Sequence, residues 1–455
     1  MYLFSGGTTI HRGLGFKYGT NALALSDEKL NRLRKEYEDL RVCIIDEISM
    51  VGADRFYDIN KRFRIINNNF EIFGGVANLC FGDLMQLPPP SARKVFLQPL
   101  SLQNQALFYS DENLWKNCKS VVLKVNHRQG EGNEWTLCLN RIRTADKLTP
   151  EDAAVLETRK IKNFPEKDFG DALHTFYTNE EVEEVNDIKL DELTDPQIIH
   201  EAVIETSESY SPRIKSYGVI DDTSFLKTLK VKVGARVMLI WNVSIWDKLV
   251  NGMTGSVIEL LFNFRQVNGE VRRTLKAIVV KFDNETVGEE TREMNWHLSE
   301  SIRSGGGVPI FTSSSESSIP GNNKCKESNN QRIEIFILSL GKNPNSKHGA
   351  KIKITQFPLR LAWAFTAHKL QGVTIAKGTD MVCHGYAKKP LPKGMAYVML
   401  SRCESIENVF LDDKFKIEDV RCEAVSMLAT KRLEESDIAP IIQKQKFDIF
   451  YMNIR

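Results

Sequence analysis

The sequence predicts an α/β fold built on a parallel β-sheet, because two apolar runs flank a helical segment. Val42–Ile45 and Val76–Phe81 are short and show no apolar–polar alternation. This is typical of strands buried on both faces of a parallel sheet. The segment between them has apolar side chains at helical spacing, at Phe56, Ile59, Phe63 and Ile66. The order strand, helix, strand indicates a doubly wound α/β domain.

Length and composition predict several domains with cores of normal size. The chain has 455 residues, of which 42% are hydrophobic and 26% charged, and this length suits about two to four domains. Its net charge is only +2, so any nucleic-acid contact must use local basic patches. The eight cysteines form no C-x-x-C pair, which favours reduced thiols over a zinc site. No apolar run approaches the ~20 residues of a bilayer span, so no membrane partner is expected.

Two adjacent acids, Asp46 and Glu47, end the first predicted strand. Burying ionised carboxylates at a strand end costs free energy unless they bind a ligand or a partner. Ligands bind at the carboxyl edge of open α/β sheets. In nucleotide hydrolases such a pair divides two tasks, holding magnesium and activating water. A strand that simply ends in solvent-exposed acids would give the same pattern.

The segment Phe81–Pro89 follows the second predicted strand. Because carboxyl ends of parallel strands meet at one edge of a sheet, Gln86 is expected beside Asp46 and Glu47. Its side chain could hydrogen-bond a phosphate or a water. A plain turn fixed by Gly82 and the prolines is the alternative.

Three later segments carry polar residues that are weak signals individually: Asn126–Gln129, Trp363–Thr374 and Ala396–Arg402. A lone arginine is usually a surface charge, and a lone histidine is more often structural than catalytic. The region from Leu229 to Phe282 is β-rich, with a turn signal at Asn251-Gly252.

Four further elements are expected in the second half of the chain. Residues 301–330 are rich in Gly, Ser and Asn, which predicts a mobile loop. A strand is predicted at Ile333–Leu340, and a helix at Leu361–Leu370 that Gly372 closes. An amphipathic helix is predicted near the C-terminus from Ile417, Val420, Ala424 and Leu428.

In this order, the polar segments resemble those of the petite-integration-frequency DNA helicases, relatives of RecD in helicase superfamily 1. The resemblance runs from about Gly6 to about Leu411. Gly6–His11 is similar to the family's DNA-contacting motif, and Asp46–Met50 is similar to its magnesium motif. Phe73–Val76 fits the family's own signature region.

The resemblance implies two RecA-like parallel-sheet lobes, the first incomplete, with an SH3-like β-barrel inserted in the second. The implied domains are 1–125 for lobe 1, 126–228 and 356–412 for lobe 2, 229–355 for the barrel with its flexible 301–330 loop, and 413–455 for a C-terminal helical tail.

The resemblance also implies catalytic roles. Asp46 would bind magnesium, and Glu47 would be the general base for the attacking water. Gln86 would sense the γ-phosphate of ATP, the substrate. Arg128 and Arg402 would act as arginine fingers, which stabilise charge that develops during phosphoryl transfer.

Further residues are implied in binding. Gln371 and Gly372 would contact the nucleotide. Hydroxyls and cations hold phosphates without reading sequence, and six residues would lie in this way along single-stranded DNA: Thr8, Thr9, His11, Thr366, His368 and Lys369. A base could also stack on Phe16 or Trp246, although core packing is the alternative for both. The implied activity is 5′-to-3′ unwinding of single-stranded and forked DNA by a monomer, in repair, recombination or telomere maintenance. The nucleus is expected as the compartment, with the mitochondrion as the alternative.

The sequence departs from the family in one motif, because no G-x-x-x-x-G-K-[ST] phosphate loop occurs in it. Backbone amides at a helix N-terminus and a lysine supply most of the grip on the phosphates. The chain by itself is therefore expected to hydrolyse ATP weakly or not at all. Three explanations are open: a clipped fragment of an active helicase, a degenerate relative such as a rolling-circle-transposon remnant, and a single-stranded-DNA-binding module that works without ATP.

Overall fold

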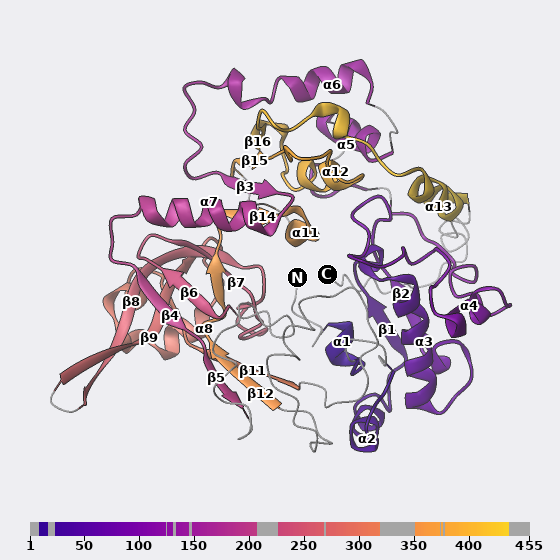
Figure 1. The fold of residues 1–455 in the computed structure, drawn as a ribbon, viewed down its shortest axis with the longest axis horizontal. Helices are drawn as coiled ribbons and strands as arrows, with labels where there is room; N and C mark the ends of the chain where they lie inside the picture. The colour runs from indigo at the N-terminus through magenta and orange to yellow at the C-terminus, as the bar shows by residue number, and fades with distance from the viewer. Residues whose placement is uncertain are drawn as a thin grey trace. The chain divides into compact units, whose positions relative to one another are not determined.

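The computed structural model describes residues 9–16, 23–123, 125–130, 133–144, 148–206, 226–267, 270–318, 351–373, 375 and 378–435. The chain divides into two compact units (Figure 1). Unit 1 is formed by residues 3–182 and 365–455, and unit 2 by residues 183–364. The domain boundaries expected from the family resemblance stay a prediction.

The first sheet of unit 1 consists of strands β1 (Val42–Ile45) and β2 (Ala77–Cys80), which are parallel as predicted. Helix α3 (Ala53–Asn67) connects them and buries its apolar face in the core of this part. The expected burial of both sheet faces is wrong, since Val42 is 41% exposed and Leu79 is 50% exposed. The physical reason is that, within the described residues, β1 and β2 pair only with each other.

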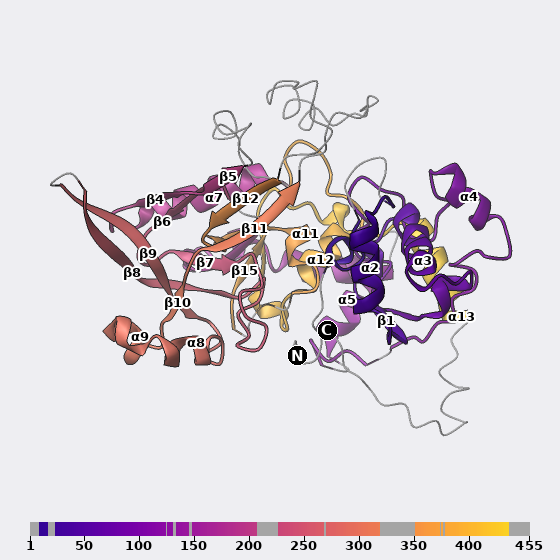
Figure 2. The same cartoon turned by 90° about the horizontal axis from the view of Figure 1, so that it is seen from below.

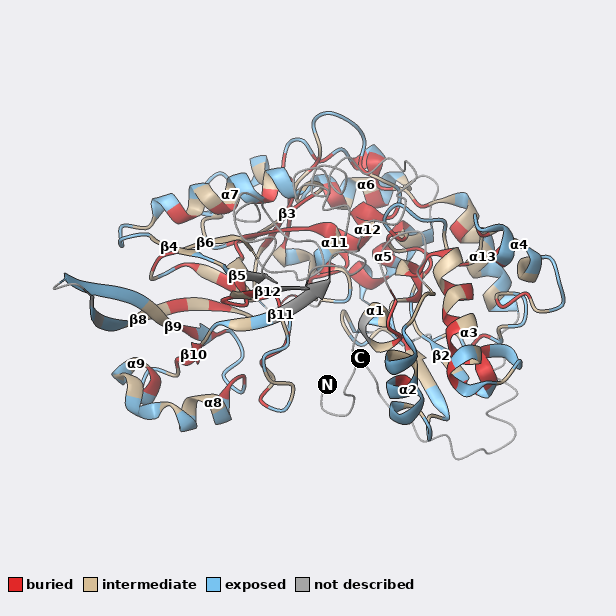
Figure 3. Cartoon of the chain, turned by 60° about the horizontal axis from the view of Figure 1, so that its bottom comes forward, coloured by how far each residue is buried: buried red, intermediate tan, exposed pale blue. Residues whose placement is uncertain are grey.

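The second sheet of unit 1 has the order β14-β3-β15-β16, and β15 pairs in parallel with both β3 and β16. These three-residue and four-residue strands are mostly buried. Figure 3 colours the chain by burial and labels β3 among them. The bounds are β3 Leu173–Phe176, β14 Ala364–Thr366, β15 Met381–Cys383 and β16 Val409–Leu411.

The remaining elements of unit 1 surround these two sheets. The helices are α1 Ile10–Gly13, α2 Asp27–Glu36, α4 Leu102–Phe108, α5 Glu134–Thr144, α6 Pro150–Glu157, α11 Ala367–Leu370, α12 Met395–Leu400 and α13 Ala424–Glu435. Short 3₁₀ turns are η1 Ile48–Met50, η2 Ile72–Gly75, η3 Ile161–Asn163, η6 Ile406–Asn408 and η7 Ile417–Asp419. Helix α7 (Asn179–Glu192) runs from unit 1 into unit 2.

Two predicted helices differ from the structure. The helix expected over Leu361–Leu370 is wrong except for its last turn, because Ala364–Thr366 is a buried strand and only α11 is helical. A continuous apolar run does not distinguish a buried strand from a buried helix. Near the C-terminus the helix begins at Ala424 instead of Ile417, since Val420 leaves helical geometry with φ −77° and ψ 90°.

Unit 2 is built mainly of β-strands, as predicted for the region that begins at Leu229, and the strand pairs described are antiparallel. Its largest sheet has the order β10-β9-β8-β7-β13, and its buried face forms the core of the unit. Two smaller sheets have the orders β11-β12-β5 and β4-β6 (Figure 2). The strand bounds are β4 Ile198–Glu201, β5 Val203–Thr206, β6 Thr228–Val231, β7 Arg236–Leu239, β8 Thr254–Val267, β9 Glu270–Phe282, β10 Val308–Ile310, β11 Ser313–Ser318, β12 Lys351–Gln356 and β13 Leu359–Leu361.

The predicted mobile loop at 301–330 is wrong for its first part. Helix α9 (Glu300–Arg303) and strands β10 and β11 occupy residues 300–318, after helix α8 (Glu289–Met294) and the turn η5 (Trp296–Leu298). Val308 and Ile310 are buried, so cross-strand pairing overrides the local Gly and Ser composition. The rest of that loop and the strand expected at Ile333–Leu340 lie outside the described residues. None of the helices described is long and apolar enough to cross a bilayer.

Candidate functional site

The carboxyl ends of β1 and β2 bring two polar loops together in unit 1. Asp46 and Glu47 follow β1 directly, and Gly82 and Asp83 follow β2. Two backbone hydrogen bonds tie these loops, from Phe81 N to Ile45 O at 2.8 Å and from Ile48 N to Phe81 O at 2.8 Å. The two segments therefore lie at one edge of the sheet, where the sequence placed them.

Glu47 sits in a strained backbone conformation at this edge. Its φ of 52° and ψ of 50° are left-handed values, which a residue other than glycine adopts at a cost of about 1–3 kcal/mol. The Asp46 carboxylate accepts a hydrogen bond from the Glu47 amide at 2.9 Å. The strain turns the Glu47 side chain away from the direction that a continuing strand would give it.

The Glu47 carboxylate is half-buried, and burial raises its pKa above the usual glutamate range. The nearby charges of Asp46 and Asp83 raise this pKa further, whereas a Gln371 hydrogen bond and the charge of Arg402 lower it. A carboxylate with a raised pKa is a stronger base than an exposed glutamate. The general-base role of Glu47 stays a prediction.

Gln371 and Gly372 hold Glu47 from the loop after α11. The Gln371 amide nitrogen donates to Glu47 Oε2 at 3.3 Å and to Ser49 Oγ at 3.2 Å. Gly372 has a φ of +77°, and a Cβ there would lie 3.1 Å from Glu47 Oε1. The loop thus packs on the carboxylate so closely that a side chain at Gly372 would displace it.

Arg402 lies just after helix α12 and is almost completely buried, with 2% of its surface exposed. Its guanidinium donates to Val398 O at 2.8 Å, to Ser401 Oγ at 2.8 Å and, more weakly, to Val373 O at 3.3 Å. Burial lowers its pKa to about 10, so the group remains protonated at neutral pH. Its charge is felt by Glu47, which places the two groups in one electrostatic environment.

Arg128 is joined to Arg402 through the backbone of Ser401. Arg128 Nη1 donates to Ser401 O at 3.1 Å, and Gln129 Nε2 donates to the same oxygen at 3.1 Å and to Cys403 O at 2.8 Å. The charge of Arg128 lowers the pKa of Arg402. Gln129 therefore binds the backbone on both sides of Arg402, a contact that its place in the polar segment Asn126–Gln129 did not reveal.

Gln86 lies half-buried in the loop after β2, and its side-chain oxygen is buried with no donor among the described residues. The Gln371 side-chain oxygen is in the same situation. A buried acceptor without a donor is costly, and a water donates hydrogen bonds whereas a phosphate oxygen only accepts them. The two amide oxygens therefore fit an ordered water better than a phosphate oxygen.

The residues present also fit a magnesium ion. Magnesium usually keeps several waters and takes one or two carboxylates together with substrate phosphates. Asp46 is exposed at the strand end and offers such a carboxylate. In the described part of the chain no cluster of three or more metal-ligating side chains occurs, so an all-protein cage is not formed there.

Asp83 and Arg143 form a bidentate ion pair that the sequence did not indicate. Arg143 Nε donates to Asp83 Oδ2 at 2.9 Å, and Arg143 Nη2 donates to Asp83 Oδ1 at 2.8 Å. The side chains are 27% and 17% exposed. Burial alone would lower the pKa of Arg143, but the Asp83 hydrogen bond and charge raise it. The pair joins the loop after β2 to helix α5.

Removing one partner of this pair should destabilise unit 1. For Arg143→Met, which leaves Asp83 unpaired, we expect a loss of roughly 1–3 kcal/mol in the free energy of unfolding. Urea titration followed by circular dichroism measures it, and Asp83→Asn with the double variant completes a double-mutant cycle. Additive losses in the double variant would show that the two side chains do not interact.

The residues expected along DNA differ in their solvent exposure. Thr8 lies outside the described residues, while Thr9 and Lys369 are exposed. Thr366 is only 5% exposed, and burial lowers the pKa of the half-buried His368, which is therefore neutral at pH 7. His11 in α1 is half-buried, with its ring edge-on to Phe16.

Of the two stacking candidates, Phe16 belongs to the core. It is 6% exposed, and the Arg55 guanidinium lies 4.5 Å from its ring centroid. Trp246 in unit 2 is 82% exposed, so core packing is wrong for this residue. Trp246 borders a hollow of about 350 Å³ with Glu289, Glu290 and Glu293, whose negative charge does not favour a nucleic acid.

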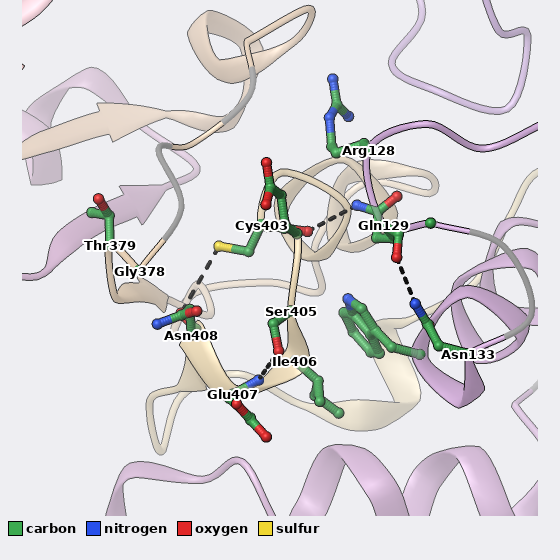
Figure 4. Close-up of a pocket in the computed structure, with 13 residues that line it drawn as sticks. Arg128, Gln129, Asn133, Gly378, Thr379, Cys403, Ser405, Ile406, Glu407 and Asn408 are labelled. Atoms are coloured by element: carbon green, nitrogen blue, oxygen red, sulfur yellow. Dashed lines mark hydrogen bonds between the residues drawn. The ribbon is translucent and has the colours of Figure 1, made fainter. Parts of the chain in front are cut away.

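A pocket of about 590 Å³ opens beside Arg128 (Figure 4). Figure 4 shows the Gln129 amide directed at Cys403, while Arg128 extends away from Ile406 and Glu407. The remaining lining comes from the segments around α5 and η6 and from the segment before β15: Gly130, Asn133, Trp135, Gly378, Thr379, Glu404, Ser405 and Asn408. The pocket therefore borders Arg128 and Gln129, whereas Arg402 does not line it.

A family profile described as PIF1-like helicase matches residues 1–144. The ATP-dependent DNA helicase PIF1 of Candida albicans is 27% identical over 440 residues, which cover 88% of this chain and 47% of that protein. The chain spans about half the length of the curated relatives it matches.

Solved structures show the same fold. The crystal structure of Pif1 helicase from Candida albicans superposes with a TM-score of 0.64 at 22% identity, covering 95% of this chain and 86% of that one. Pif1 helicase from Bacteroides, in complex with ADP-AlF3 and single-stranded DNA, superposes with a TM-score of 0.61 at 23% identity, covering 95% and 84%. RecA-like α/β architecture is therefore confirmed, whereas the SH3-like character of the β insertion stays a prediction.

Proposed function

We propose that this chain is a member of the PIF1-like helicases, to which it is similar, and that it acts in DNA unwinding coupled to ATP hydrolysis. The observation that supports this most directly is the setting of Glu47. Its carboxylate lies at a strand end in a left-handed backbone, is held by Gln371 and shares an electrostatic environment with Arg402. A solvent-exposed strand end would have none of these features.

In the proposed reaction a water attacks the γ-phosphorus of ATP while its proton passes to a Glu47 carboxylate oxygen, and ADP leaves. Gln86 and Gln371 offer buried acceptor oxygens that orient this water. Magnesium held by Asp46 would, when bound, neutralise charge on the phosphates. Arg402 carries positive charge in a desolvated setting, where it stabilises a developing negative charge more than in water. Arg128, bonded to the Ser401 carbonyl, would add a second positive charge.

The proposed DNA path uses exposed residues of unit 1. Lys369 and Thr9 are placed to contact phosphates, with Thr8 and His11 beside Thr9 in sequence. Thr366 and His368 are better placed to shape the short helix α11 between Lys369 and the Gln371 loop, because Thr366 is buried at its start. We propose 5′-to-3′ polarity and a role in repair, recombination or telomere maintenance in the nucleus, all from the family resemblance. Imaging the tagged protein against nuclear and mitochondrial markers tests the compartment.

A DNA-stimulated ATPase assay tests the function. The chain by itself is expected to show little or no turnover with or without single-stranded DNA, because its sequence has no phosphate loop. A lengthened chain, in which the phosphate-loop segment of the Candida albicans relative precedes residue 1, is expected to hydrolyse ATP and to be stimulated by single-stranded DNA.

The controls separate this function from the second candidate, a catalytically inactive module that binds single-stranded DNA. Such a module would use exposed residues such as Thr9 and Lys369 without a nucleotide. DNA binding by the lengthened chain without any turnover would support it and contradict the helicase proposal. Robust turnover by the unextended chain that Glu47→Gln abolishes would instead show that the phosphate loop is dispensable.

A further inference from the structure

Strands β8 and β9 of unit 2 extend well beyond the sheet that contains them. Strand β7 pairs with β8 only at residues 254–256, and β10 pairs with β9 only at residues 278–280. The distal parts, 261–267 of β8 and 270–276 of β9, pair only with each other in the described structure. We call these residues the hairpin arm, which projects past the other strands in Figures 1 and 2.

The hairpin arm concentrates positive charge. Residues 261–276 contain four cationic residues and one acidic residue, a net charge of +3, whereas the whole chain carries +2. Arg272 and Arg273 are both exposed. Within the described residues neither guanidinium has a carboxylate partner, and Arg273 lies over the Phe262 ring with 5.1 Å to its centroid. The arm therefore attracts a polyanion.

One face of the arm is aromatic. Phe264 pairs with Arg273 across the arm, and Phe262 pairs with Leu275, so alternation puts these four residues on one face. Phe264 is 69% exposed, and Val271 on the same face is 68% exposed. A ring with open surface beside a guanidinium is the arrangement on which nucleic-acid bases stack.

Protection of open strand edges explains only part of this pattern. Charged residues on an unpaired edge discourage edge-to-edge association, which would account for the arginines. An exposed phenylalanine and valine between them have the opposite effect. A two-stranded ribbon is also marginally stable by itself. Extending the hairpin arm beyond the core therefore costs free energy of folding and adds no stability.

We propose that the hairpin arm binds single-stranded nucleic acid, with bases stacked on Phe264 and Phe262. Phosphates would be contacted by Arg273 on this face and by Arg272 from the opposite face of the arm. Stacking favours a single strand over a duplex, because a duplex hides its base faces. The inference rests on the proposed function for the presence of a DNA strand. It adds a contact in unit 2 that needs neither the nucleotide nor the hydrolytic site.

The test is fluorescence anisotropy of the full chain with labelled oligothymidylate, measured without nucleotide over a range of salt concentrations. Phe264→Ala is expected to weaken binding about tenfold, and Phe264→Trp should retain it. Arg272→Ala with Arg273→Ala should lower the magnitude of the slope of log affinity against log salt by about 1.4. The matched controls are Met294→Ala, which removes another exposed apolar side chain, and Lys281→Ala with Arg303→Ala, which removes the same charge elsewhere in unit 2.

The proposal would be overturned if Phe264→Ala and the double arginine variant both kept the affinity and salt slope of the parent. An equal loss of affinity and salt slope in the charge-matched control would also overturn it. Loss in Phe264→Trp as large as in Phe264→Ala would overturn the stacking contact. Tighter binding of a labelled duplex, insensitive to Phe264→Ala, would overturn the choice of a single strand. Failure of the proposed function would appear separately, as absent DNA-stimulated hydrolysis in the lengthened chain.

Discussion

Replacing Arg402 with alanine is expected to lower the ATP turnover of the lengthened chain by about 10³–10⁵-fold while largely sparing ATP binding. Arg402 is a buried cation whose pKa, although lowered by burial to about 10, keeps it charged at neutral pH. Its charge reaches Glu47, and a desolvated charge stabilises a transition state more strongly than an exposed one. Single-turnover hydrolysis and nucleotide-binding measurements on the same preparation separate the two effects.

The Arg402 variant needs a structural control, because its guanidinium also donates to Val398 O and Val373 O. Arg159→Ala is suitable, since Arg159 donates to Val409 O at 2.9 Å and to Glu407 O at 2.8 Å in the same unit. The Arg159→Ala variant should lose hydrogen bonds to backbone carbonyls, as Arg402→Ala does, with little effect on ATP turnover. Arg402→Lys keeps the positive charge but lacks the planar guanidinium, so its ATP turnover should lie between those of the parent and Arg402→Ala. Equal losses of binding and turnover in Arg402→Ala would contradict the finger role.

Replacing Glu47 with glutamine is expected to lower turnover of the lengthened chain by about 10²–10⁴-fold, the usual contribution of a general base. Glutamine keeps the shape of the side chain and can still accept from Gln371, but it takes no proton from water. Stopped-flow phosphate release under single-turnover conditions measures the loss. Turnover within a few-fold of the parent would exclude Glu47 as the base.

The same residue predicts a pH dependence with a defined sign. A general base must be deprotonated, so hydrolysis should fall as pH decreases through the Glu47 pKa, which burial raises above the usual glutamate range. Gln371→Leu removes a hydrogen bond that lowers this pKa. The acidic limb of the rate profile should then move to higher pH. An unmoved limb in Gln371→Leu would show that another group controls it.

Stability gives an independent check on the Glu47 variant. Because the folded-state pKa of Glu47 is raised, its favourable contribution is complete below the unfolded pKa and is lost as pH rises through the folded pKa. At neutral pH the ionised carboxylate is therefore a cost, and Glu47→Gln should unfold at a higher urea concentration than the parent. The difference should shrink as pH falls. Lost activity with gained stability is the pattern expected of a functional residue.

Several site features could be predicted because the chemistry is local in sequence. Asp46 and Glu47 follow β1, the segment of Gln86 follows β2, and parallel pairing brings both to one sheet edge. The approximate position of helix α3 followed from apolar spacing alone. Local patterns failed where burial was uniform, as at Ala364–Thr366, because an all-buried run gives no periodicity to read.

The contacts that tune the site could not be predicted in the same way. Gln371 holds Glu47 across 324 residues, and Arg143 holds Asp83 across 60 residues. Gln129 was visible in a polar segment, but its bonds to the carbonyls on both sides of Arg402 depend on where two distant loops meet. The exposure of Phe264 likewise depends on where β7 and β10 stop pairing with β8 and β9.

The sequence by itself determined the class of this protein: an α/β chain with polar motifs in the order of a helicase, and with no phosphate-loop motif among them. Only the tertiary structure decided which of those polar groups are buried, which are charged and which face each other. The physical reason is that a motif consists of a few neighbouring residues in the sequence. Desolvation and pairing, which set pKa and reactivity, arise between segments far apart in the chain.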